Sequence, residues 1–171
     1  MQTKEICYLA DHALTALIDQ LASFDQEQLN LEPFKASWTA GQVGEHMIMA
    51  NSGFVEMING PVADTEREPD QFVAQIRDDF SNYHIKMRAP DFIKPALTSY
   101  NKEYLIHSLN YIKTDLKRSI TTLDLNMTCT SFAIPVMGYI TRLEAVTFVI
   151  YHTQRHVHQL KNIHFSILNM Q

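Results

Sequence analysis

Glycine and proline are scarce in this sequence: the chain of 171 residues contains five glycines and six prolines. Both residue types interrupt helices. Several of them stand between stretches in which apolar residues recur at regular spacing. This scarcity favours a helical protein.

Cysteine is scarcer still, because only Cys7 and Cys129 are present, far apart and without the spacing of metal ligands. The two could form one disulfide, but nothing in the sequence requires it, and a reduced cytoplasmic protein is the simpler interpretation. The first residues carry charge at Lys4 and Glu5 and show no signal-peptide apolar block. No run approaches the ~20 apolar residues that a membrane span needs. We therefore expect a cytoplasmic protein with no membrane partner.

An excess of basic residues is also missing, since 14 Lys and Arg face 19 Asp and Glu, for a net charge of -5. Nothing here attracts a phosphate backbone, so we expect no nucleic-acid partner. What the chain does have is apolar content: 46% of its residues are hydrophobic, enough for a core. Length and composition together predict a single domain over residues 1–171.

Apolar spacing predicts four long helices. The first covers residues 4–24. The second begins at a capping box, in which Thr39 is followed three residues later by Gln42, and ends at Gly60. The third runs from about residue 100 to 123.

A second capping box, Thr141 with Glu144, opens the fourth helix, which reaches about Leu168. Residues 61–98 are less regular, although Pro69 could open a short helix through Phe80. The sequence therefore predicts an all-α protein, a four-helix bundle with a long irregular connection between helices two and three.

The fourth helix carries the most informative residues. His152 and His156 are four residues apart, so their imidazoles stack on one helix face. They belong to a seam that is apolar at both ends and polar in the middle: Ala145, Val149, His152, His156, Gln159 and Ile163. Burying consecutive polar side chains costs several kcal/mol unless each finds a partner, and a metal ion is one good partner.

The second helix offers a third imidazole at His46, followed on the same face by the small residues Ala50 and Gly53. If the second and fourth helices are neighbours, His46 can meet His152 and His156. Three imidazoles with open coordination positions are typical of a catalytic metal site, and they suit Zn, Ni, Fe or Mn. The alternative is that these are ordinary core histidines that bond to a carbonyl or carboxylate.

Other residues carry weaker signals. His12 is expected at the surface or in packing, although its helix could also line the cavity. Trp38 is expected to pack on Val43 or Met47 at the entry of the second helix, and Arg155 to hold a protein carboxylate at the rim. No nucleophile elbow, phosphate loop, cysteine pair or Rossmann fingerprint is present.

Three segments resemble the DinB-like superfamily, the YfiT-like group of helical bundles. The segment WTAGQVGEH (residues 38–46) resembles its W-[ST]-x-x-[EQ]-[IV]-x-x-H motif. Residues 135–159, from PVMGYITRLE through Phe148 to Gln159, resemble its C-terminal signature P-x-x-G-x-[LI]-[ST]-x-x-E…F-x-x-x-H-x-x-R-H-x-x-Q. The segment RAPDFIKP (residues 88–95) is similar to its mid-chain a-P-x-x-[IL]-x-P pattern.

The resemblance implies a four-helix bundle of that topology, often a homodimer, and a three-His site for a divalent metal at His46, His152 and His156. Zinc or nickel is the first expectation, with iron or manganese as alternatives. Some members transfer low-molecular-weight thiols such as bacillithiol or mycothiol to electrophiles, others are thiol-dependent isomerases, and many have no known reaction. The family often has His just before Pro135, where this chain has Ile134.

Taken together, these features predict a divalent-metal-dependent thiol S-transferase acting on a small molecule, in which Gln159 binds substrate or orients an imidazole. A metal-dependent hydrolase is the close alternative, because metal-activated water is the same chemistry with another ligand. A non-catalytic, stress-linked bundle that binds a metal or small ligand is an alternative of another class.

Overall fold

The computed structural model describes residues 2–169, and within them the chain is mostly helical. The elements follow in the order α1 (Thr3–Ala22), η1 (Gln28–Asn30), α2 (Ala40–Asn59), β1 (Val62–Ala63), α3 (Val73–Ser81), η2 (Asp91–Ile93), α4 (Lys102–Thr122), β2 (Thr128–Cys129) and α5 (Arg142–Leu168). The two short strands pair antiparallel. The helical prediction is confirmed, and the connection before α4 contains α3 and the 3-10 turn η2.

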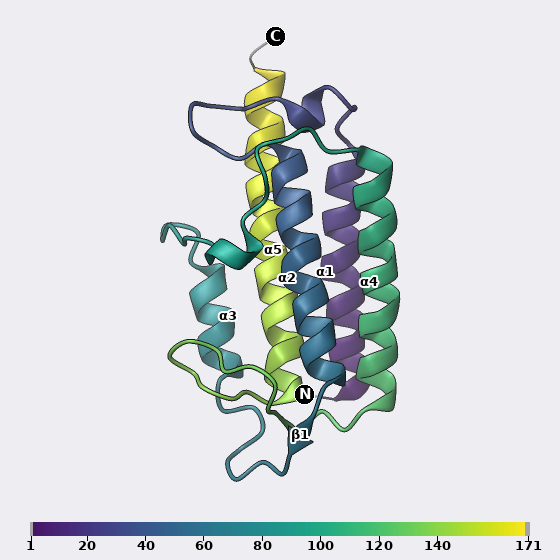
Figure 1. The fold of residues 1–171 in the computed structure, drawn as a ribbon, viewed down its shortest axis with the longest axis vertical. Coiled ribbons are helices and arrows are strands. Elements are labelled where there is room, and N and C mark those ends of the chain that lie inside the picture. Colours follow the sequence, from purple (N-terminus) through teal and green to yellow (C-terminus); the bar gives the residue numbers. More distant parts are fainter. Residues whose placement is uncertain (1, 170–171) are drawn as a thin grey trace.

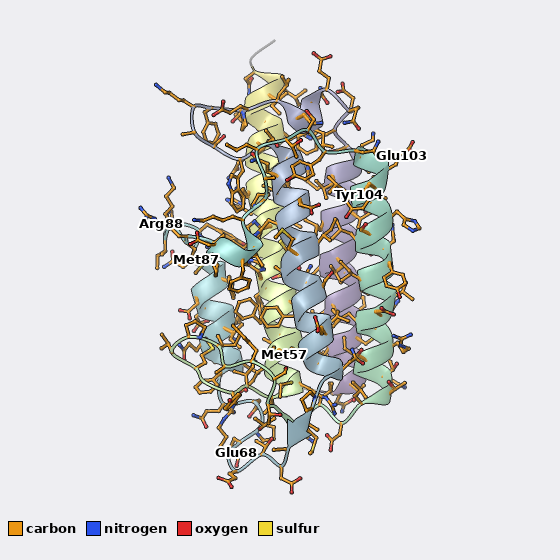
Figure 2. All side chains as sticks on the ribbon, in the orientation of Figure 1. Met57, Glu68, Met87, Arg88, Glu103 and Tyr104 are labelled. Atoms are coloured by element: carbon orange, nitrogen blue, oxygen red, sulfur yellow. The ribbon has the colours of Figure 1, made fainter. Side chains whose placement is uncertain are left out.

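The four long helices lie side by side, with α1 and α5 running in one direction and α2 and α4 in the other (Figure 1). Each of α1 and α2 packs on both α4 and α5, and the short helix α3 packs on the outer side of α5. Side chains fill the space between the long helices, whereas Glu68 and Arg88 project at the periphery (Figure 2). None of the helices in residues 2–169 combines the length and apolarity that crossing a membrane requires.

Both predicted capping boxes are present. The Thr39 hydroxyl accepts from the Gln42 amide at 3.1 Å, and the Gln42 side chain accepts from the Thr39 amide at 3.0 Å. Thr141 and Glu144 repeat this exchange at the start of α5, at 3.2 and 2.8 Å. These caps satisfy amides that have no partner within the helix, which fixes the first residue of α2 and of α5.

The buried Glu144 also ties the start of α5 to the segment that leads into α3. Its carboxylate accepts two hydrogen bonds from the Arg67 guanidinium, at 2.8 and 2.6 Å, and one from the Phe72 amide at 2.8 Å. With the bond from Thr141, every acceptor direction of this buried charge has a donor, which is what makes its burial tolerable. These hydrogen bonds hold the start of α3 against α5.

Close approach of α2 and α4 depends on Gly44. A Cβ atom at this position would lie 2.9 Å from the Leu105 side chain. Residue 44 is two positions before His46 and lies on the opposite side of α2, so the glycine sets how closely the helix packs on its other side.

Candidate metal centre

Three histidines converge between α2 and α5. His46 comes from α2, and His152 and His156 lie one turn apart on α5. The His152 Nε2 atom is 3.4 Å from Nε2 of His46 and 3.0 Å from Nε2 of His156. One ligand atom from each ring lies within 4.8 Å of the other two. The structure thus brings together the three residues that the sequence predicted as ligands.

The outer nitrogens of two of these rings are fixed by oxygen acceptors. His46 Nδ1 donates to the Ile93 carbonyl at 2.9 Å, and His156 Nδ1 donates to Oε1 of Gln159 at 2.7 Å. A proton on Nδ1 leaves the Nε2 lone pair free, so both rings present the tautomer that a metal ion needs. Gln159, predicted to bind substrate or orient an imidazole, is placed to do the second.

The spacing of the Nε2 atoms fits coordination. Metal–nitrogen bonds of about 2.0–2.1 Å place neighbouring ligand nitrogens about 2.9–3.4 Å apart in octahedral or tetrahedral geometry. His152 Nε2 meets that range with both partners. Hydrogen bonds alone would satisfy these rings less well than an ion. A single proton on His152 Nε2 would be shared between the lone pairs of His46 and His156, and the buried Nδ1 of His152 has no partner. The residues present therefore fit a divalent cation.

Burial keeps these imidazoles neutral. His46 and His152 are 2% and 8% exposed, and His156 is half-buried. Desolvation lowers the pKa of His46. It lowers the pKa of His152 well below the ordinary value, helped by the neighbouring His156 and His46 rings. The pKa of His156 falls to about 3, again mainly through burial and then through His46. Neutral imidazole is the form that binds metal.

Comparison with known proteins identifies the family. The profile of the DinB superfamily matches residues 9–160, a span that contains all three histidines and Gln159. The chain belongs to the DinB superfamily. It is 23% identical over 146 residues to YuaE of Bacillus subtilis (strain 168), described as an uncharacterized protein, and the match covers 85% of this chain and 88% of YuaE. No solved structure matches it. The resemblance read from the sequence motifs is confirmed.

Aromatic side chains wall the histidine cluster of this DinB superfamily member. The Trp38 ring lies 5.1 Å from the His46 ring, so it contacts the site directly rather than only packing at the helix entry as predicted. Phe80 of α3 and Phe148 of α5 lie 5.2 and 5.6 Å from the His152 ring. These rings exclude water from one side of the cluster.

Arg155 corrects a prediction. It was expected to hold a carboxylate, but its guanidinium donates to backbone carbonyls at the end of α3 and just after it: Phe80 at 3.4 Å, Asn82 at 2.8 Å and Ile85. The same segment reaches the histidines further along, at the Ile93 carbonyl. Sequence reasoning missed Ile93 as a partner of His46, although the family-like segment at residues 88–95 contains it.

The remaining histidines lie outside the cluster. His12 is exposed and lies 6.1 Å from the Tyr8 ring, so it does not line the site. His158 is exposed and stacks on Tyr83 at 4.1 Å, and His164 contacts Phe24 at 4.5 Å. None of these three residues belongs to the cluster, and the exposed position of His12 agrees with its expected place at the surface.

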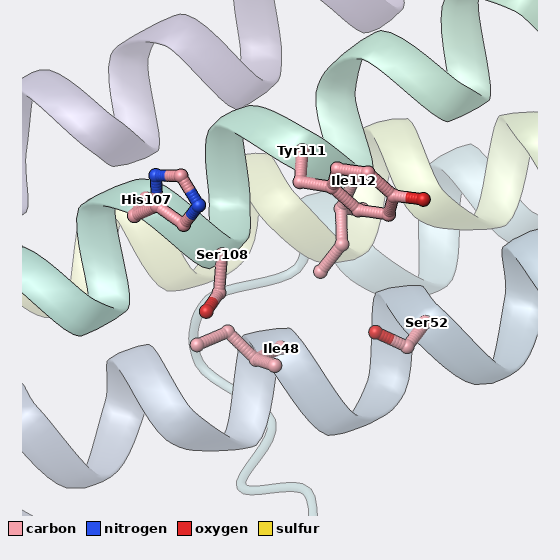
Figure 3. Close-up of a pocket in the computed structure, with 6 residues that line it drawn as sticks. All are labelled: Ile48, Ser52, His107, Ser108, Tyr111 and Ile112. Carbon is pink, nitrogen blue, oxygen red and sulfur yellow. The ribbon is translucent and has the colours of Figure 1, made fainter.

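A surface groove between α2 and α4 is separate from the cluster (Figure 3). It has a volume of about 270 Å³ and is lined by Ile48, Ser52, His107, Ser108, Tyr111 and Ile112. Ile48 and Ser52 lie two and six residues after His46, which places them on the opposite side of α2. The groove therefore does not open onto the three histidines.

Proposed function

We propose that this protein is a divalent-metal-dependent thiol S-transferase. The observation that supports the proposal is the convergence of three neutral imidazoles through their Nε2 atoms in an aromatic-walled site. Within residues 2–169, no carboxylate forms a hydrogen bond or ion pair with any of the three rings. Three protein ligands leave coordination positions for small molecules, as in catalytic rather than structural sites.

The reaction joins the sulfur of a small thiol to an electrophilic carbon. A divalent ion held by His46, His152 and His156 would stabilise the thiolate, the nucleophilic form of the thiol. The sulfur–carbon bond forms as the bond from carbon to the leaving group breaks, the leaving group takes the electron pair, and the thiol proton goes to water. Gln159 holds the ring of His156, and the Ile93 carbonyl holds that of His46.

The absence of a carboxylate at the rings favours a thiol over water as the bound nucleophile. A free thiol has a pKa of about 8.5, whereas bulk water has a pKa of about 15.7, so water requires much more assistance. Hydrolases of this kind commonly add a carboxylate as general base. His46 is held by the Ile93 carbonyl at Nδ1 and would give its Nε2 lone pair to the ion, so it cannot also serve as that base.

We further propose zinc or nickel as the ion, and a thiol of the bacillithiol or mycothiol type as the co-substrate. All-nitrogen donor sets suit both ions, and the family resemblance supports the thiol. We also propose the four-helix-bundle topology of the family, a homodimer and a cytoplasmic location. The unpaired Cys7 and Cys129 suit a reducing compartment.

The proposal is tested with protein purified without a histidine tag. Metal content is measured for the wild type, for His46→Ala and for His158→Ala, a matched control on the exposed face of α5. Conjugation of monobromobimane to bacillithiol, mycothiol, glutathione, coenzyme A and cysteine is then followed with and without EDTA. We expect EDTA-sensitive conjugation in the wild type and in His158→Ala, and neither metal nor activity in His46→Ala.

Two results would contradict the proposal. Metal-replete protein that is inert toward every thiol and binds none of them would assign a non-catalytic, metal-binding role. A His152→Ala variant that retains its full metal content would show that the histidines are ordinary core residues.

A further inference from the structure

The chain between α3 and α4 lies against the histidine cluster with few buried side chains of its own. Residues 82–96, called here the covering segment, contain η2, which packs on α2 (Figure 1). Only Pro95 is buried within the segment, and the ring stack of Tyr83 on His158 of α5 lies on the exposed surface. A segment that buries so little apolar surface opens easily unless specific contacts hold it.

Hydrogen bonds from three helix side chains hold the covering segment. Arg155 of α5 donates to two carbonyls near its start, one of them at 2.8 Å, and Gln42 of α2 donates to a carbonyl at its end, at 3.3 Å. Between these two anchors, His46 Nδ1 donates to the Ile93 carbonyl at 2.9 Å. One of the three bonds that fix the covering segment to the helices α2 and α5 is therefore made by a metal-ligand candidate.

His46 connects the covering segment to the cluster through its single ring proton. In the neutral imidazole, an ion on Nε2 leaves that proton on Nδ1, where it reaches the Ile93 carbonyl. Without an ion, the proton can instead lie on Nε2, 3.4 Å from Nε2 of His152. The Nδ1 lone pair would then face the lone pairs of the carbonyl oxygen. An ion on Nε2 therefore favours the bond that holds the segment closed.

We propose that metal binding and closure of the covering segment are one linked equilibrium, in which Arg155 is a positioning residue. The Arg155 guanidinium donates to carbonyls of the chain and not to the histidine rings, so it acts by keeping the Ile93 carbonyl against His46. Linkage is reciprocal: an ion favours closure by the same factor by which closure strengthens the binding of the ion. The inference rests on the metal site of the proposed function, but not on its thiol chemistry.

The charge of Arg155 sharpens the test, because its two effects on an ion have opposite signs. Burial and the neighbouring rings are the main causes that lower the pKa of His152 and of His156, and the Arg155 charge adds to both. A positive charge that disfavours a proton on these rings also disfavours a cation between them. Electrostatics alone would thus make Arg155→Met bind metal more tightly, whereas loss of the anchor would weaken binding.

The affinity for zinc and for nickel is measured by competition with a chromophoric chelator, using the untagged full chain. Arg155→Met should bind the preferred ion about ten-fold more weakly, since losing the partner of a metal-bound histidine lowers affinity by about 10–100-fold. Arg77→Met is the matched control, because Arg77 is exposed and pairs only with the adjacent Asp78, and it should bind as the wild type does. Equal or tighter binding by Arg155→Met would overturn the proposal.

Hydrogen–deuterium exchange gives the reciprocal measurement. The amides of Ile85, Ile93 and Lys94 donate hydrogen bonds inside the covering segment. The ion should slow their exchange by about ten-fold in the wild type and leave it unchanged in His46→Ala. Slow exchange in α1 and α4 reports that each variant is folded. Wild-type protein that binds the ion without any slowing at these three amides would contradict the linkage.

The two measurements also separate this inference from the proposed function. Ion-dependent closure in a protein that conjugates no thiol would uphold the linkage and overturn the S-transferase. Metal-dependent thiol conjugation by a protein whose covering segment does not respond to the ion would do the reverse. Failure of the wild type to bind either ion would overturn both.

Discussion

The three histidines of the cluster are oriented by different partners. His46 is held by a backbone carbonyl and His156 by the Gln159 side chain, whereas the outer nitrogen of His152 is buried without any partner. Outer hydrogen bonds of this kind fix the ring and raise the basicity of the ligand nitrogen. The orientation of His156 therefore depends on a side chain, that of Gln159, which mutation can change.

Replacing the Gln159 side chain should change the affinity of the histidines for metal. Gln159→Leu removes the acceptor for His156 Nδ1 and should lower metal affinity by about 10–100-fold, the usual effect of losing such a partner. Gln159→Glu keeps an oxygen acceptor and should retain the affinity. Competition with a chromophoric chelator measures both. Gln154→Leu, on the same helix but without a bond to the histidines, is the control, and an equal loss there would contradict the assigned role.

Among the elements, the segment that follows α3, residues 82–96 with η2 inside it, lies over the site. It is held at one end by Arg155, which donates to the carbonyls of Asn82 and Ile85, and at the other by His46 and by Gln42, whose amide donates to the Ala96 carbonyl at 3.3 Å. Both anchors belong to the helices that carry the ligands. The covering segment and the candidate metal centre are thus held by the same two helices, α2 and α5.

Arg155→Met tests this anchoring because it keeps the apolar stem and removes the donors. Hydrogen bonds from charged groups contribute about 1.5–3 kcal/mol each, so amide exchange in residues 82–93 should accelerate by about ten-fold or more. The amides of α1 and α4 should be unaffected. Hydrogen–deuterium exchange measures this, with Arg77→Met as the control, since Arg77 is exposed and pairs only with the adjacent Asp78. Unchanged exchange in that segment would argue against the anchor.

Across the whole molecule, a bound ion should stabilise the fold. Ligand present at 100 times its dissociation constant adds about 2.7 kcal/mol to the free energy of unfolding. For a chain of this length that corresponds to a rise in Tm of about 5–10 °C. Differential scanning calorimetry with zinc or nickel, and then with EDTA, should show the rise and its reversal.

The same scans on His46→Ala and His158→Ala separate the site from incidental binding. The rise should disappear in His46→Ala and persist in His158→Ala. An undiminished rise in His46→Ala would mean that the ion stabilises the protein elsewhere.

Local signals predicted much of this architecture. The capping boxes at Thr39 and Thr141 depend on residues three positions apart, so their chemistry is visible in the sequence. The seam of α5 likewise predicted that His152 and His156 face inward. The partners of Arg155 are 70 to 75 positions away and are backbone carbonyls, which carry no sequence signature. That is why a carboxylate was wrongly expected there.

The position of the ligands along the chain has a consequence for stability. His46 and His152 are 106 residues apart, on helices that run in opposite directions (Figure 1). An ion shared between them would be a removable cross-link between two distant parts of the chain, and it would stabilise the protein because only the folded chain holds the three ligands together. Unlike a disulfide, the link survives in a reducing environment and opens when the ion leaves. The stability of the folded state would then follow the supply of metal around it.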